Sequence, residues 1–192
     1  MHFEVEQKFR VQNLADIQRQ LERLGACFGT SLHQVDRYFA HPQRDFSQTD
    51  EALRIRQVGG SSIVTYKGPK LDATTKTRQE IEVPLDEPVR SAELFVEILT
   101  KLGFRSAGTV NKKRRCAVLT WQEQPVEAAL DDVEHLGTFL ELELSADDTS
   151  LDAARNRLAT LVAELQLGQG ERRSYLEMVL EQMRNGNSPN LR

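Results

Sequence analysis

The segment Glu4-Val5-Glu6-Gln7-Lys8-Phe9-Arg10 near the N-terminus alternates ionised side chains with mostly apolar ones. A period of two residues is typical of a β-strand, because successive side chains of a strand point to opposite faces of the sheet. One face of this strand therefore carries two carboxylates, an ammonium group and a guanidinium group in a row. The other face is suited to a hydrophobic core.

The same alternation returns in three further segments. They are Leu53-Arg54-Ile55-Arg56, Arg78-Gln79-Glu80-Ile81-Glu82-Val83 and Leu140-Glu141-Leu142-Glu143-Leu144. Strand positions that face solvent usually carry Thr, Ser, Gln and scattered Lys, whereas Arg and Glu dominate here. The repeated pattern predicts several strands that together build one charged wall.

Two arrangements accommodate such strands. The charged faces either lie in bulk water, or a closed barrel directs them inward and turns the apolar faces outward beneath helices. An eight-stranded barrel can hold side chains and one small ligand. The candidate inward residues nearly balance in charge, as an enclosed set must, and we therefore expect the barrel. The acids are Glu4, Glu6, Glu80, Glu82, Asp131, Glu141 and Glu143, and the bases are Lys8, Arg10, Arg54, Arg56, Lys67, Arg78, Lys112 and Arg114.

The remaining patterns predict helices between the strands. Apolar stripes with capping residues indicate helices that begin after Asn13, near Ser91, at about Asp148 and after Ser174. Alternating segments predict strands near residues 3–11, 33–40, 52–58, 61–68, 76–84, 109–120, 126–133 and 138–146. The predicted class is α+β, with an eight-stranded antiparallel closed barrel and helices packed on its outside. We expect a single domain over residues 1–183 and a disordered tail over 184–192.

Composition limits the possible functions. The formal net charge of −4 argues against bulk attachment to nucleic acid or to an anionic membrane. No apolar run approaches the length of a membrane span, and we expect no signal peptide. Cys27 and Cys116 show no metal-binding spacing, so we expect reduced thiols and a cytoplasmic protein.

The charged residues also indicate the kind of ligand. Clustered carboxylates suit hard divalent cations such as Mg²⁺, and clustered Arg and Lys suit phosphate oxygens. The histidines show no ligand spacing for zinc, and no Ser/His/Asp or Cys/His arrangement points to a covalent intermediate. A metal ion together with a polyphosphate is the substrate class that this chemistry fits.

The segment from Glu4 to Lys8 resembles the ExExK signature of the CYTH superfamily, the triphosphate tunnel metalloenzymes. That group includes class IV adenylyl cyclases, thiamine triphosphatases, inorganic tripolyphosphatases and fungal-type RNA triphosphatases. The resemblance extends from Phe3 to about Tyr175. It rests on further segments in the family order: Ala52–Arg56, Thr65–Pro69, Lys76–Glu82, Val110–Arg114, Leu130-Asp131 and Leu136–Glu143.

The resemblance implies a triphosphate-binding tunnel with Mg²⁺ or Mn²⁺. The implied metal ligands are Glu4, Glu6, Asp131, Glu141 and Glu143. The implied phosphate-binding residues are Lys8, Arg10, Arg54, Arg56, Lys67, Arg78, Lys112, Arg114 and Arg173. The implied catalytic residues are Glu6, Glu141, Lys8 and Lys67. The resemblance also suggests a homodimer.

Three functions fit this resemblance. The chain looks most like the group of class IV adenylyl cyclases, which convert ATP to cyclic AMP and pyrophosphate. A triphosphatase that hydrolyses tripolyphosphate, thiamine triphosphate or a nucleoside triphosphate is the first alternative, because adenine recognition would lie outside the shared charged residues. A non-catalytic polyphosphate-binding module is the second alternative, although it would not need the full acidic set.

Overall fold

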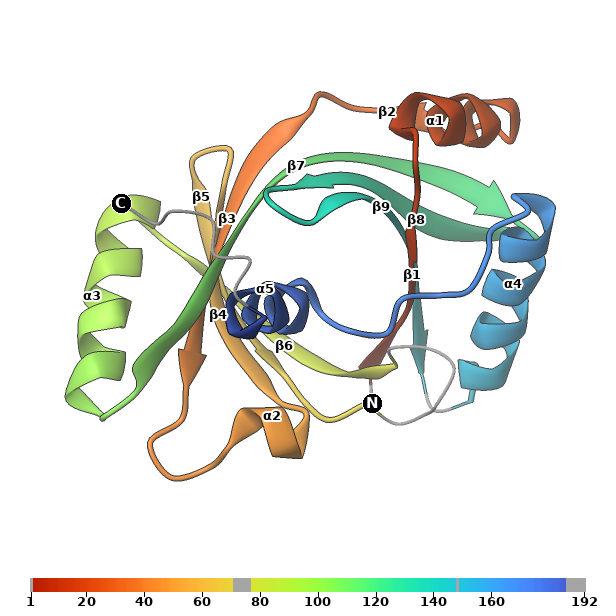
Figure 1. The fold of residues 1–192 in the computed structure, drawn as a ribbon. Helices are drawn as coiled ribbons and strands as arrows, with labels where there is room; N and C mark the ends of the chain where they lie inside the picture. The colour runs from red at the N-terminus through yellow and green to blue at the C-terminus, as the bar shows by residue number, and fades with distance from the viewer. Residues whose placement is uncertain (1, 71–76, 148, 186–192) are drawn as a thin grey trace. The chain divides into compact units, whose positions relative to one another are not determined.

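The computed structural model describes residues 2–70, 77–147 and 149–185, and only the backbone of His2 (Figure 1). Most of the expected tail, residues 184–192, therefore lies outside the described residues. In chain order the elements are β1 (His2–Arg10), α1 (Leu14–Arg23), β2 (Cys27–Phe28), β3 (Leu32–Ala40), α2 (Phe46–Thr49), β4 (Ala52–Val58), β5 (Ser61–Lys67), β6 (Arg78–Leu85), α3 (Pro88–Lys101), β7 (Arg105–Trp121), β8 (Gln124–Val133), β9 (Gly137–Asp147), α4 (Leu151–Glu164) and α5 (Tyr175–Arg184).

The predicted helices are all present, and their caps explain where they begin. The Asn13 side chain accepts a hydrogen bond from the backbone N–H of Ala15 at the start of α1. Ser174 and Glu177 form a reciprocal capping box at the start of α5. Helix α3 begins at Pro88 rather than near Ser91, because proline is tolerated in the first helical turn. The short elements α2 and β2 were not predicted, since neither is long enough to show a period.

The strands follow one hydrogen-bonded order, β2-β7-β3-β4-β5-β6-β1-β9-β8, and β7 also pairs with β8. Strand β2 adds to β7 alone, and the order of the other eight strands closes on itself. Every pairing whose register is described is antiparallel. The closed order is that of an eight-stranded antiparallel barrel and confirms the predicted fold class.

The residues group into two compact units. The first unit comprises residues 1–32, 70–79 and 113–172, and the second comprises residues 33–69, 80–112 and 173–192. Strands β6 and β7 each run through both units. The single domain boundary at residue 183 stays a prediction.

The core of the first unit lies on the apolar face of β1 and β9. Val5 is directly opposite Leu144, and Phe9 is directly opposite Leu140; all four side chains are buried. Helices α1 and α4 cover this face with buried residues of their own, which are Ile17, Leu21, Leu158 and Leu161. The period of two seen in the sequence thus separates a helix-covered apolar face from a charged one.

The core of the second unit lies beneath α3. Ile55 of β4 is directly opposite Val64 of β5, and both pack with Ala92 and Leu99 of α3. Burying a side chain of this size contributes about 1.5–3 kcal/mol. None of the helices in the described residues is long and apolar enough to cross a membrane.

Helix α5 packs in the second unit at Gly108 of β7. A Cβ atom built on Gly108 would lie 2.9 Å from Cδ1 of Leu176 and 3.9 Å from Cδ2 of Leu180. Further along the same strand, Nζ of Lys112 lies 5.0 Å from the centroid of the Tyr175 ring. The absence of a side chain at Gly108 therefore lets the helix approach β7 near a predicted phosphate-binding lysine.

We expect Leu142→Ala to lower the free energy of unfolding by about 3 kcal/mol, because Leu142 is fully buried in the core of the first unit. Urea denaturation followed by circular dichroism measures the change. Val118→Ala is the matched control, since Val118 is 54% exposed. Equal losses for the two variants would contradict this description of the core.

Candidate active site

The charged face of β1 and β9 in the first unit is fixed by the register between these strands. Lys8 is directly opposite Glu141, and Glu6 is directly opposite Glu143. Side chains opposite each other in an antiparallel pair share one face, with Cβ atoms about 4.5–5.5 Å apart. The predicted metal ligands and the signature lysine are therefore brought together on one face, as their alternation indicated.

The opposed carboxylates Glu6 and Glu143 are the best candidate for a metal site. Like charges directly opposite each other repel, so a cation between them would be stabilising. Glu127 of β8 is also directly opposite Glu143, which extends the row of carboxylates across a third strand. Sequence reasoning missed Glu127, because Ala129, the next residue on the same face of β8, carries no charge.

Lys8 is 1% exposed, which is unusual for an ammonium group. Glu141 lies across from it on β9, and Nζ is 6.0 Å from the centroid of the Phe139 ring. Glu4, which is on β1 like Lys8, lies directly opposite Arg78 of β6, and the side chain of Arg78 is also buried. These neighbours offset part of the cost of burying two positive charges.

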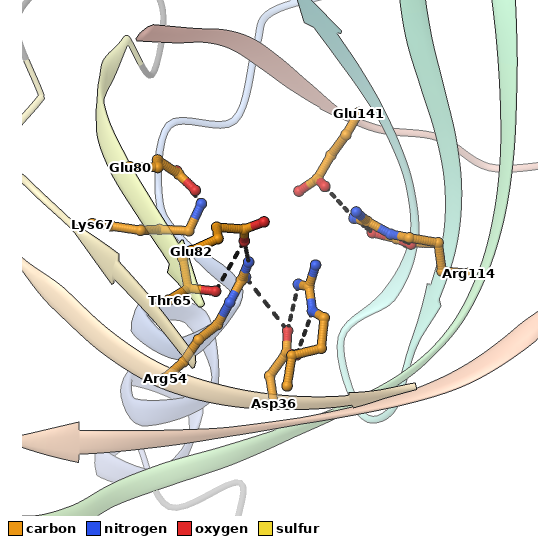
Figure 2. Close-up of polar contacts among 10 residues, drawn as sticks. Asp36, Arg54, Thr65, Lys67, Glu80, Glu82, Arg114 and Glu141 are labelled. Carbon is orange, nitrogen blue, oxygen red and sulfur yellow. Dashed lines mark hydrogen bonds and ion pairs between the residues drawn. The ribbon is translucent and has the colours of Figure 1, made fainter. Parts of the chain in front are cut away.

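Arg114 links two of the predicted acids in the first unit. Its Nε donates to Oδ1 of Asp131 at 2.7 Å, and its terminal nitrogen Nη2 donates to Oδ2 of Asp131 and to Glu141. Figure 2 shows Arg114 and Glu141 pointing toward each other. Asp131 is fully buried, and both of its oxygens are occupied by this guanidinium fork.

A second cluster of charges lies in the second unit, around Asp36 of β3. Arg56 donates to both oxygens of Asp36, at 2.7 and 2.8 Å, and Nη1 of Arg54 lies 3.7 Å from Oδ2 (Figure 2). Burial raises the pKa of Asp36, but the hydrogen bonds from Arg56 and the charges of both arginines outweigh it. The net pKa is well below the ordinary value of a carboxyl.

Arg54 is the most enclosed base of this cluster. It is directly opposite Thr65 of β5 and lies 3.7 Å from Oε1 of Glu82, to which Thr65 donates a hydrogen bond at 3.0 Å. Burial lowers the pKa of Arg54, but Asp36, Tyr38 and Glu80 together raise it more, so the net pKa is raised. Its Nε is buried and has no hydrogen-bond partner within the described part of the chain. Such a group is costly to leave unpaired and is suited to a ligand oxygen.

Tyr38 lies on the same face as this cluster, directly opposite Arg54. It is buried, and burial together with the charge of Asp36 raises the pKa of its hydroxyl. Two residues along β5 from Thr65, Lys67 forms an ion pair with Glu80 of β6, as Figure 2 shows. Asp36 and Thr65 were not singled out from the sequence as site residues.

Arg10 and Arg173 are two further predicted phosphate-binding residues. Arg10 is exposed, donates to the backbone oxygen of Leu136 at 2.6 Å and lies over the Phe139 ring. Arg173 forms an exposed ion pair with Glu181 of α5. Their predicted roles in phosphate binding stay predictions.

The donor set can be compared with the needs of a divalent metal ion. Among residues 2–70, 77–147 and 149–185, no three His, Cys, Asp or Glu side chains converge to form a complete metal site. Mg²⁺ does not require one, because it is usually held by one or two carboxylates, several waters and the phosphates of its substrate. The opposed carboxylates Glu6 and Glu143 fit that mode of binding.

The chain is similar to known proteins over nearly its whole length. A family model described as the CYTH domain matches residues 2–175. A protein of Methanocaldococcus jannaschii named "Putative adenylate cyclase MJ0240" is 39% identical over 178 residues, which cover 91% of this chain and 97% of that protein.

Solved structures resemble the fold. The PH1819 protein of Pyrococcus horikoshii OT3 is 38% identical, with a TM-score of 0.79 over 93% of this chain and 99% of that one. A Hippeastrum protein, described as a putative adenylyl cyclase that reveals a dominant triphosphatase activity, is 16% identical, with a TM-score of 0.61 over 100% of this chain and 99% of that one. At this identity the second similarity concerns the fold alone.

We expect Asp36→Asn to lower the free energy of unfolding by about 3–5 kcal/mol near neutral pH, because it leaves the buried Arg54 and the partly buried Arg56 without their carboxylate. A carboxyl with a lowered folded-state pKa stabilises the fold above its unfolded-state pKa, about 4, and this stabilisation is lost as the pH falls further. The difference between variant and wild type should therefore shrink below about pH 4.

Urea denaturation across this pH range measures the difference. The control is Glu134→Gln at an exposed position, which should change stability little. A gap that stays constant as the pH falls would show that the charge of Asp36 is not its cause.

Proposed function

The chain belongs to the CYTH domain family, and from this membership we propose that it is an enzyme that acts on a triphosphate with Mg²⁺ or Mn²⁺. The observation that carries the proposal is the pair of opposed carboxylates, Glu6 and Glu143, on the same strands and face as Lys8. The two carboxylates would hold a metal ion next to the buried ammonium group of Lys8. A metal ion beside a positive side chain suits a metal-bound polyphosphate. The reaction that we favour is that of a class IV adenylyl cyclase.

Basic residues in each unit are suited to phosphate oxygens. In the first unit these are Lys8, Arg78 and Arg114, and in the second they are Arg54, Arg56, Lys67 and Lys112. The carboxylates beside them hold several of these groups in place before a ligand binds. Preorganised guanidinium groups stabilise the charge that develops during phosphoryl transfer without reorganising at the moment of reaction.

The proposed metal ligands are Glu4, Glu6, Glu141 and Glu143, which lie on one face of β1 and β9. A bound divalent ion would neutralise phosphate charge and activate the nucleophile. We assign a different role to Asp131. Because both of its oxygens bind Arg114, we propose that it positions this guanidinium group rather than the metal.

In the cyclase reaction the 3′-hydroxyl oxygen of ATP forms a bond to the α-phosphorus, and the bond from that phosphorus to the bridging oxygen of the β-phosphate breaks. Pyrophosphate leaves, and the hydroxyl proton passes to a base or to water. Lys8 and Lys67 would neutralise negative charge on the phosphates as the bond breaks. The similarity to the Methanocaldococcus protein supports this choice.

A triphosphatase is the second candidate, because the charged residues described above recognise phosphates and not a base. In that reaction water attacks the terminal phosphorus and orthophosphate leaves. The Hippeastrum protein, which has the same fold, is named as a cyclase and described as mainly a triphosphatase. The fold therefore does not decide between the two reactions.

The products distinguish these reactions. Purified protein is incubated with ATP, tripolyphosphate or thiamine triphosphate, each with Mg²⁺ or Mn²⁺. Cyclic AMP with an equal amount of pyrophosphate is expected. Orthophosphate without a cyclic product would replace the cyclase with the triphosphatase, and no turnover of any substrate would contradict both.

We expect Glu6→Gln to reduce turnover by about a hundredfold or more and to weaken Mn²⁺ binding, because it removes one of two opposed carboxylates. Mn²⁺ binding in the presence of a non-hydrolysable ATP analogue is measured by calorimetry, which does not depend on activity. Glu134→Gln, an exposed change on the turn between β8 and β9, is the control. Unchanged Mn²⁺ affinity in Glu6→Gln would remove this residue from the proposed site.

We expect Asp131→Asn to weaken substrate binding more than metal binding, because it loosens the fork that holds Arg114. The KM for the triphosphate should rise about tenfold or more, whereas the dependence of the rate on Mn²⁺ concentration should change little. A shift confined to the Mn²⁺ dependence would instead make Asp131 a metal ligand.

A further inference from the structure

The face of the second unit that carries Asp36, Arg54 and Arg56 changes in character along its strands. On β3 the next residue of this face beyond Asp36 is Gln34, and on β4 the next residue beyond Arg56 is Val58. Gln34 and Val58 lie directly opposite each other, and neither carries a charge. The charged part of the face, which Figure 2 shows around Asp36 and Arg54, therefore ends at these two residues.

Strands β5 and β6 continue this uncharged part. Ile63 of β5 lies directly opposite Arg56 on one side and Pro84 of β6 on the other. Side chains that lie opposite each other share one face of the sheet. Val58 and Ile63 are partly exposed and Pro84 is exposed, so this apolar surface is accessible in part. All of these residues belong to the second unit, and we call Gln34, Val58, Ile63 and Pro84 the uncharged end.

Gln34 gives the uncharged end a polar group that lacks a partner. The residue is only 7% exposed. Its Oε1 is buried and accepts no hydrogen bond from any residue that the structure describes. A buried acceptor is costly to leave unpaired, and a donor on a ligand would remove that cost. An apolar surface with a few placed polar groups is the usual composition of a site for a small molecule.

The place of the uncharged end beside the arginines suits a nucleoside. Gln34 and Val58 lie two residues beyond Asp36 and Arg56, which is about 7 Å along the strands. A ribose can bridge such a separation, so a phosphate at Arg56 would bring the base of the same nucleotide against the uncharged end. The flat base would lie on the apolar side chains. The amide of a glutamine can pair with the amino group and a ring nitrogen of adenine.

We propose that the uncharged end holds the base of a nucleoside triphosphate, and that Gln34 selects a base with an amino group, such as adenine. The inference rests on the proposed function, because it takes the arginines of the same face as phosphate-binding residues. It extends that function to the part of the substrate that the charged residues do not recognise. Tripolyphosphate has no base and would gain nothing from the uncharged end.

Calorimetry with two ligands that cannot be turned over tests this proposal. The first is an ATP analogue with methylene groups in place of both bridging oxygens of its phosphate chain, and the second is the same chain without a nucleoside. Both are measured with Mn²⁺. Gln34→Leu should weaken binding of the ATP analogue by about tenfold or more, because the base loses its hydrogen-bond partner. The affinity for the base-free chain should not change.

A second variant and a matched control accompany Gln34→Leu. Val58→Phe fills the space beside Gln34 and should also weaken binding of the ATP analogue alone. Gln57→Leu is the control, because Gln57 precedes Val58 on β4 and lies on the opposite face, where it accepts a hydrogen bond from Arg37 at 3.2 Å. It should leave both affinities unchanged. Circular dichroism checks that all three variants fold.

The outcomes separate this inference from the proposed function. A wild type that binds the base-free chain as tightly as the ATP analogue would overturn the inference and leave the triphosphate site in place. The inference also falls if Gln34→Leu weakens both ligands equally or leaves the ATP analogue unaffected. A wild type that binds neither ligand would overturn the proposed function, and this inference with it.

The choice of base is tested with ATP and inosine triphosphate, which has a carbonyl oxygen in place of the amino group of adenine. The wild type should have a kcat/KM about tenfold or more higher for ATP, and Gln34→Leu should treat the two substrates nearly alike. A preference for ATP that persists in Gln34→Leu would show that other residues select the base.

Discussion

Pairing between buried carboxylates and guanidinium groups is the interaction on which the charged faces of this protein depend. Asp36 and Asp131 are both almost completely buried, and an isolated carboxylate in that position would cost more free energy than a fold of this size has to spare. Each is held through both oxygens by one arginine, Arg56 in the second unit and Arg114 in the first. Without these paired hydrogen bonds from arginine, the two aspartates could not be buried in their strands.

In the proposed function, the same pairs would set the conditions for phosphate binding. A phosphate that approaches Arg114 or Arg56 meets a group that already contacts a carboxylate, so the ligand has to compete for it or share it. A ligand with one negative charge gains little under these conditions. The proposed triphosphate substrate would contact several cations at once, and each contact would add to the same binding event. The arrangement is therefore suited to polyanions and much less to single phosphates or carboxylates.

Much of this organisation could be predicted from the sequence. Alternation of Glu, Lys and Arg with apolar residues located β1, β4, β6 and β9. Successive side chains of a strand point to opposite faces, so the alternation also predicts which residues share a face. Asp36 escaped notice, since its neighbours on the same face, Gln34 and Tyr38, carry no charge and leave no alternation to detect. The sequence pattern of one strand also does not show which strand pairs with it. That Glu6 meets Glu143 and Lys8 meets Glu141 follows only from the pairing of β1 with β9.

The contact between α5 and β7 differs in kind from these ion pairs. At Gly108 carbon atoms of Leu176 and Leu180 lie against bare backbone. Ionic strength screens attractions between charges, whereas added salt leaves contacts between hydrocarbon groups in place or strengthens them. In concentrated salt the last helix would therefore stay packed on its strand, whereas an exposed ion pair such as that of Arg173 with Glu181 would weaken.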